Sequence, residues 1–250
     1  MINLIRGEWY KLRKSRYFLG IIFLAVIFGM FLTEMWIEDR EMNPTFNDVI
    51  KNGAMSIQYA YERISMGSFL FALFGEMFIV NDFNNRNFVR SFSYGFKRSK
   101  LILSKLIVYI LFSLFLELIY TIVLVTYVSN KYGFCGKING DFILYLFSVV
   151  VSLILFSIAI ISIIAAVAII TRSFFITLVL PIMIFGSYIY MYKNVGSHCF
   201  VLFSCMPWLR PLVNFQYEAD SIISIISLIV MLSMTIGGSL LFIRQKDIVN

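Results

Sequence analysis

The residues best suited to chemistry lie in one polar stretch, Asp82–Leu106, which separates two long hydrophobic runs. Its sequence, DFNNRNFVRSFSYGFKRSKLILSKL, combines basic, aromatic and amide side chains. Such side chains suit binding rather than bond cleavage, because arginines pair with carboxylates and aromatic rings anchor protein interfaces. Helical spacing would place Phe88 and Phe92 one turn apart on one face, and Arg86 and Arg90 on another. We therefore expect a docking surface for another protein.

The docking stretch must be positioned by the runs on either side of it. The preceding run reads ISMGSFLFALFGEMFIV and the following one VYILFSLFLELIYTIVLVTYV, and each is long enough to cross a bilayer. We expect a short helix over 84–94, with Gly95 as its left-handed cap. A helix held in this way at the membrane surface would pass a push from a soluble partner to both flanking spans.

Catalytic motifs are missing from the sequence. No GxxxxGKS or GxxxxGKT phosphate loop occurs, and a single histidine, His198, cannot supply an HExxH zinc site or a convincing catalytic triad. We therefore expect no enzyme activity, no catalytic residue, no metal site and no cofactor bound by this chain. A membrane-embedded enzyme is a disfavoured alternative, which turnover by the purified chain alone would reveal.

Glu117 is a carboxylate near the middle of a hydrophobic run, where a charged residue costs roughly 2.5 to 3.5 kcal/mol on insertion scales. It must face protein, water or a partner. One interpretation is a residue that lines a transport pathway or gates a closed interface. The other is a protonated carboxyl bonded to Tyr120, Thr121 or a serine of a neighbouring helix. Nearer the membrane surface, Glu76 is expected to pair with a basic residue such as Arg90 or Lys105.

Composition places the chain in a bilayer. Hydrophobic residues make up 60% of the 250 positions and charged residues 14%, with a mean hydropathy of +0.86. Backbone groups in lipid must be satisfied within each segment, so the apolar runs are helices. The fold class is an all-α membrane protein with one domain over 1–250 and six spans, at about 17–37, 64–80, 107–128, 142–170, 174–192 and 221–243.

Basic residues indicate the orientation, because Lys and Arg concentrate in cytoplasmic loops. With the N-terminus inside, both termini are cytoplasmic and 14 of the 21 basic residues lie inside. These are Arg6, Lys11, Arg13, Lys14, Arg16, Arg86, Arg90, Lys97, Arg98, Lys100, Lys105, Arg172, Arg244 and Lys246. The net charge of +7 then reflects topology and attraction to anionic membrane lipids, and no nucleic-acid partner is expected.

Residues 2–14 are expected to form a helix that lies flat in the headgroup layer before the first span. Ile2, Ile5, Trp9 and Leu12 recur at helical spacing, with most charged residues on other faces. This is the pattern of an elbow helix. A basic anchor that only sets topology would give the same pattern.

The outside loops carry weaker signals. Glu38–Arg63 is mildly acidic and could attract a cationic substrate, although a plain polar connection is the simpler interpretation. The stretch Lys193–Asp220 is apolar but broken by prolines, so we expect it to dip into the outer leaflet. Cys199 and Cys205 could form a disulfide in an oxidising setting, or be small apolar loop residues.

The polar stretch resembles the segment that follows the second span in membrane subunits of type-2 ABC exporters. That segment has an Asp-aromatic start, a Ser-x-Gly-x-Ser-Arg middle and a closing Ser-Lys or Ala-Lys. The positions that fall on it are Asp82, Phe83, Phe88, Phe92, Ser93, Gly95, Arg98, Leu101, Ser104 and Lys105. The opening EWYKLRKSR resembles the Glu-x-x-Lys elbow of the same family. The chain departs from the pattern at Asn84, Arg86 and Asn87, where an acidic residue and a Gly-Thr pair are usual.

The resemblance implies a division of labour between subunits. Residues 84–94 would be the coupling helix that docks on a separate dimeric ATPase, which would bind the ATP and Mg²⁺, and two permease subunits, identical or paralogous, would pair around a path. The implied ATPase-docking residues are Asp82, Phe83, Arg86, Phe88, Arg90, Phe92, Gly95, Arg98 and Lys105. The implied elbow residues are Glu8, Trp9 and Lys11, and Glu117 is a possible pathway residue.

Size and composition are similar to those of immunity permeases that protect bacteria from lantibiotics and bacitracin-like peptides. By this analogy the chain lies in the bacterial plasma membrane and expels amphipathic, hydrophobic or cationic peptides. Two alternatives remain: an ABC-2 exporter of a lipid or hydrophobic drug, and a sensor or accessory subunit without transport. In the second alternative the basic stretch binds a kinase or only anionic lipid.

Overall fold

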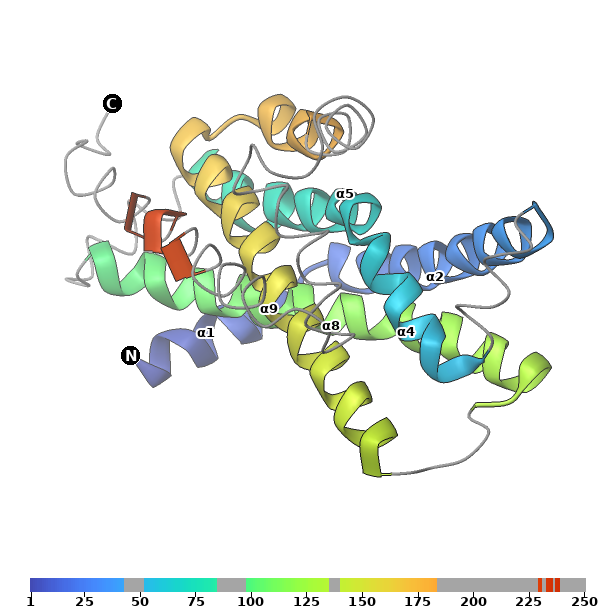
Figure 1. Cartoon of the computed structure of the whole chain (residues 1–250). Helices are drawn as coiled ribbons and strands as arrows, with labels where there is room; N and C mark the ends of the chain where they lie inside the picture. Colours follow the sequence, from blue (N-terminus) through green and yellow to red (C-terminus); the bar gives the residue numbers. More distant parts are fainter. Residues whose placement is uncertain are drawn as a thin grey trace.

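The computed structural model describes residues 1–42, 52–84, 98–134 and 140–183, with short pieces at 229–230, 233–235 and 237–238. Regular structure in these ranges is entirely helical (Figure 1). The elements are α1 (Ile2–Lys14), α2 (Tyr17–Met42), α4 (Gly53–Glu62), α5 (Ile64–Gly75), the π-helix η1 (Glu76–Val80), α6 (Asn81–Asn84), α8 (Arg98–Tyr132) and α9 (Gly140–Thr171). A further apolar helix covers Phe174–Met183.

Four helical segments are long and apolar enough to cross a membrane: Tyr17–Met42, Met66–Phe83, Ser99–Tyr132 and Ile154–Thr171. They coincide with the first four expected spans. The helix Phe174–Met183 begins where the fifth span was expected. The rest of that span, most of the sixth, the stretch Lys193–Asp220 and the cysteine pair lie outside the described residues.

Helix α8 is the axis of the bundle. It packs against α1, α2, α4, α5 and α9, and in Figure 1 α9 crosses it diagonally. Its 35 residues correspond to roughly 50 Å of helix at about 1.5 Å per residue. That length exceeds the bilayer's hydrocarbon thickness of about 30 Å, so α8 begins before its apolar part and can present polar residues at both ends.

The core of the bundle is aromatic. Phe74 of α5 lies between two rings of α8, with its centroid 5.2 Å from that of Tyr109 and 4.7 Å from that of Phe112. The Tyr109 hydroxyl donates a hydrogen bond of 2.7 Å to the carbonyl of Phe71. This bond satisfies the phenol in an apolar interior, where an unpaired hydroxyl would be costly.

The predicted helix over 2–14 is confirmed by the bounds of α1. It ends at Ser15, whose backbone is extended (φ −72°, ψ 144°) and whose hydroxyl donates 2.5 Å to the carbonyl of Leu12. The chain then enters α2 at Tyr17. Ser15 and Arg16 thus separate the basic helix from the first apolar span.

Two elements were not predicted. The loop expected over 38–63 contains α4, which packs on α8 and begins with hydrogen bonds from the amides of Gly53 and Ala54 to the carbonyls of Gly133 and Phe134. The second is the π-helical turn η1 within the second span. A π turn carries an extra residue and is common at functional sites, and this one ends two residues before Asp82.

Candidate functional site

Lys105 is the buried centre of a charged cluster. Its ammonium donates to Glu8 Oε2 at 3.2 Å and to an Asp82 carboxylate oxygen. Only 4% of the Lys105 side chain is exposed, and 7% of that of Glu8. The other Glu8 oxygen accepts from Lys11 at 3.0 Å. We call these four residues the Lys105 cluster, and it joins α1, α6 and α8.

The charges of the Lys105 cluster balance, with two carboxylates and two ammonium groups. The ammonium of Lys105 also lies 4.3 Å from the centroid of the Phe78 ring in η1, a cation–π contact that strengthens when water is excluded. Because burial makes a single unpaired charge costly, removal of one partner from such a cluster is expected to cost about 3 to 5 kcal/mol. The cluster therefore holds three separate segments in one arrangement.

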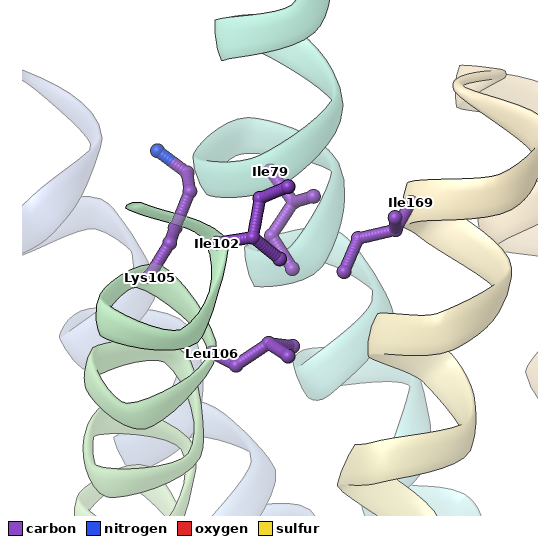
Figure 2. A pocket seen from close by; sticks show the side chains of 5 residues that line it. All are labelled: Ile79, Ile102, Lys105, Leu106 and Ile169. Atoms are coloured by element: carbon purple, nitrogen blue, oxygen red, sulfur yellow. The ribbon is translucent and has the colours of Figure 1, made fainter. Parts of the chain in front are cut away.

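Beside the cluster, α8, η1 and α9 meet in a tight apolar joint. Figure 2 shows Ile79, Ile102, Leu106 and Ile169 converging on one another, while the nitrogen of Lys105 is directed away from them. The joint is too narrow to hold a water molecule. The methylene stem of Lys105 thus packs against apolar residues, and its charged end reaches the two carboxylates.

Phe83 contacts the far end of α9. The guanidinium of Arg172 lies 5.0 Å from the centroid of the Phe83 ring, and Arg172 has a positive φ of 50° just after α9 ends. The sequence placed both residues on the same side of the membrane, and the structure brings them together. Arg172 was not predicted as a partner, and its isolation between two apolar runs was the available signal.

The structure tests only part of the expected docking stretch. Asp82 and Lys105 form an ion pair, Phe83 contacts Arg172, and Arg98 is the first residue of α8. The expected coupling helix beyond Asn84, with Arg86, Phe88, Arg90, Phe92 and Gly95, lies outside the described residues. Its role stays a prediction.

The expected pairing of Glu76 with Lys105 was wrong, and its alternative partner Arg90 lies outside the described residues. Lys105 pairs with Glu8 and Asp82, whereas Glu76 has no ion pair within the described ranges. The reason is geometric: Glu76 is the first residue of η1, and Asp82 lies beyond that wider turn.

The expected elbow residue Trp9 contacts α8, with its ring edge-on to that of Phe112 and the two centroids 6.4 Å apart.

Glu117 is 3% exposed and accepts a hydrogen bond of 2.6 Å from the Ser157 hydroxyl of α9. A serine of a neighbouring helix was one of its expected partners. Around it, the buried atoms Glu117 Oε2, Ser113 Oγ, Tyr120 Oη and Thr121 Oγ1 have no hydrogen-bond partner among the described residues. The four residues recur at helical spacing on α8, so they form a polar seam inside the bundle.

A second polar cluster lies at the opposite end of the bundle. Asp39 Oδ2 accepts from Arg63 at 2.6 Å and from the Tyr59 hydroxyl at 2.8 Å, which ties α2 to α4. Burial, together with the hydrogen bond to Asp39, raises the pKa of Tyr59 above its ordinary value, so its hydroxyl keeps its proton at neutral pH. This cluster braces the end of the bundle away from α1.

Comparison with known proteins identifies the family to which the chain belongs. A family model described as "ABC-2 family transporter protein" matches residues 4–190 of the 250. No curated protein matches the chain. The match covers α1 from its third residue onward, the Lys105 cluster and the four apolar spans of the described residues. Within the part described by the structure, these are the features of a multi-pass membrane permease, and the chain belongs to the ABC-2 family of transporter proteins.

Proposed function

We propose that the chain is the permease subunit of an ATP-driven exporter that expels amphipathic, lantibiotic-like peptides from the bacterial plasma membrane. Transport is driven by a separate dimeric ATPase that binds ATP and Mg²⁺ on the cytoplasmic side. A second permease subunit, identical or paralogous, completes the path. Family membership supports this proposal, because ABC-2 permeases generally work with an ATPase partner.

The contact between Lys105 and Asp82 is the observation that carries the proposal. These residues stand at either end of the polar stretch. A force applied to the residues between them therefore acts on α6 and α8 at the same point, and Glu8 adds α1 to the same unit. A loop clamped at its base in this way is suited to transmit movement rather than absorb it.

Movement of the clamped ends would pass into the membrane along α8. The hydrogen bond between Glu117 and Ser157 joins α8 to α9 in the bundle interior, so a displacement of α8 changes the seam between them. Peptides dissolved in the outer leaflet would need only a lateral entry and an outward push. Large apolar side chains exposed on α2, including Leu19, Phe23 and Met30, offer a lipid-like route for them.

Recovery of the ATPase tests the docking role. The tagged chain is purified from cells that also express the ATPase subunit, and the amount of ATPase recovered is measured for wild type, Phe88→Asp and Phe92→Asp. We expect stoichiometric recovery with wild type and loss with either variant. Phe134→Asp is the matched control, since Phe134 is exposed beyond the other end of α8. Unchanged recovery with Phe88→Asp and Phe92→Asp would remove the docking role.

Reconstitution tests the cargo. The chain and its ATPase are placed in vesicles, and ATP-dependent loss of a fluorescent lantibiotic from the membrane is followed. We expect loss only when both subunits and ATP are present. Movement of a labelled lipid or hydrophobic drug, without movement of the peptide, would assign the exporter a different cargo. No movement of any of the three, despite ATPase recovery, would favour a sensor or accessory subunit.

A further inference from the structure

A hollow of about 510 Å³ lies between α1 and α8. Its volume falls within the range of small-molecule sites, about 300 to 1,000 Å³. The lining residues come from the two helices and the start of α2: Trp9, Arg13, Phe18, Leu111, Phe112 and Phe115. We call this the α1–α8 groove.

The floor of the groove is aromatic and fixed. Phe112 is fully buried, and its ring centroid lies 5.3 Å from that of Phe18 and 5.9 Å from that of Phe115. Leu111 and Phe115 stand at the sides and are about half exposed. Such walls offer dispersion contacts to a flexible hydrocarbon chain, and no acidic residue lines the groove in the part of the chain that the structure describes.

Among the described residues that line the groove, Arg13 carries the only charge. It is exposed in the last turn of α1 and has no ion pair within the described ranges. The other basic residues of that turn are already engaged, since Lys11 pairs with Glu8 and Lys14 lies over the Tyr10 ring. Arg13 also precedes the first residue of an apolar span, Tyr17, by four positions, which places its guanidinium at headgroup depth.

We propose that the α1–α8 groove binds an anionic phospholipid, whose phosphate pairs with the Arg13 guanidinium and whose acyl chain lies along Phe18, Leu111 and Phe115. A planar guanidinium can form two parallel hydrogen bonds to phosphate oxygens. The groove is apolar beyond Arg13, along Phe18, Leu111 and Phe115. A phospholipid has a charged headgroup and apolar acyl chains, so both of its parts find matching side chains there. This site is independent of any ATPase or exported cargo.

Charge favours a lipid over a second copy of the chain. Pairing about a two-fold axis would bring the same surface of both copies together. In the groove that surface includes α1, which carries four basic residues, Arg6, Lys11, Arg13 and Lys14, and one acidic residue, Glu8. Like charges would then face one another, whereas an anionic headgroup neutralises Arg13.

Lipid retention by the purified full-length chain tests the proposal. The chain in detergent is titrated with phosphatidylglycerol or phosphatidylcholine, and bound lipid is counted by native mass spectrometry. We expect preferential retention of phosphatidylglycerol, weakened about fivefold by Arg13→Gln, the ratio expected for one basic residue at an anionic surface. Lys14→Gln is the matched control, because it removes an equal charge from the same turn but does not line the groove.

Two further variants separate the parts of the site. Arg13→Lys keeps the positive charge but loses the planar guanidinium that can donate two parallel hydrogen bonds to a phosphate. We therefore expect its retention of phosphatidylglycerol to lie between that of wild type and that of Arg13→Gln. Leu111→Trp fills the groove and should lower retention of both lipids, with an unchanged elution volume as the check on folding. Equal retention of the two lipids by wild type, or an equal loss with Arg13→Gln and Lys14→Gln, would overturn the proposal. A dimer crosslinked through cysteines placed at Leu111 would overturn it in favour of a second copy.

Discussion

At the scale of single residues, the Lys105 cluster contains residues that could be predicted from the sequence and contacts that could not. Glu8, Asp82 and Lys105 were each predicted as functional residues, from the family's elbow and coupling segments. Their meeting was not predicted, because 97 positions separate Glu8 from Lys105 and no spacing rule links residues on different helices. The same limit explains the wrong pairing of Lys105 with Glu76, which was expected because both lie near the inner membrane surface.

Lys105→Met should destabilise the protein strongly. The change leaves the buried carboxylate of Glu8 and the partly buried carboxylate of Asp82 without their shared cation, so we expect a loss of about 3 to 5 kcal/mol. Thermal unfolding of the purified chain in detergent measures it. Lys100→Met is the control, because Lys100 is an exposed residue of the same helix.

The triple variant Glu8→Gln, Asp82→Asn and Lys105→Met removes all three charges together. We expect it to recover part of the lost stability, because residues in one network are not additive. An unfolding temperature for Lys105→Met equal to that of Lys100→Met would show that the cluster does not hold the helices together.

Glu117→Leu should lower transport more than Glu117→Gln. The glutamine keeps an oxygen that can accept from Ser157, while leucine does not. Hydrogen bonds between helices in membranes average about 0.6 kcal/mol, so both variants should fold. The readout is ATP-dependent export by the chain reconstituted with its ATPase.

Ser157→Ala removes the donor of the same bond and should resemble Glu117→Leu in export. Equal export by wild type and by the leucine and glutamine variants would exclude Glu117 from the transport mechanism. A normal Ser157→Ala beside an impaired Glu117→Leu would show that Glu117 acts through a contact other than Ser157.

At the scale of elements, hydrophobic runs were the strongest signal. The first four spans and α1 could be predicted, because long apolar stretches and a helical spacing of Ile2, Ile5, Trp9 and Leu12 are properties of the chain itself. Helix α4 was missed because it is short, mixed in polarity and stabilised by packing on α8. The π turn η1 was missed for a related reason, since an extra residue in a helix leaves no mark on hydropathy.

The contact between α2 and α8 depends on Gly29. A Cβ added there would lie 2.8 Å from Val123 Cβ and 3.0 Å from the Tyr120 carbonyl oxygen. Gly29→Ala should therefore separate the helices and cost about 1 to 3 kcal/mol, seen as a lower unfolding temperature in detergent. Gly20→Ala is the matched control on α2, because nothing lies within 4 Å of its Cβ position. Equal temperatures for the two variants would contradict this close approach.

At the scale of the molecule, the bundle has two chemically different ends. The Lys105 cluster and the contact between Phe83 and Arg172 mark one end. The Asp39–Arg63 pair and the start of α4 mark the other. The distribution of basic residues in the sequence assigns the first end to the cytoplasm. The relative arrangement follows from the structure, and the assignment to sides stays a prediction.

Accessibility from outside the cell tests that assignment. In a chain with Cys135, Cys199 and Cys205 changed to serine, single cysteines are introduced as Lys100→Cys or Phe134→Cys. Both positions are exposed, and they lie toward opposite ends of α8. A membrane-impermeant maleimide added to intact cells should label Phe134→Cys alone, and Lys100→Cys should react only after lysis. The reverse pattern would place the Lys105 cluster outside, where no ATP-driven subunit could act on it, and would overturn both the topology and the proposed export mechanism.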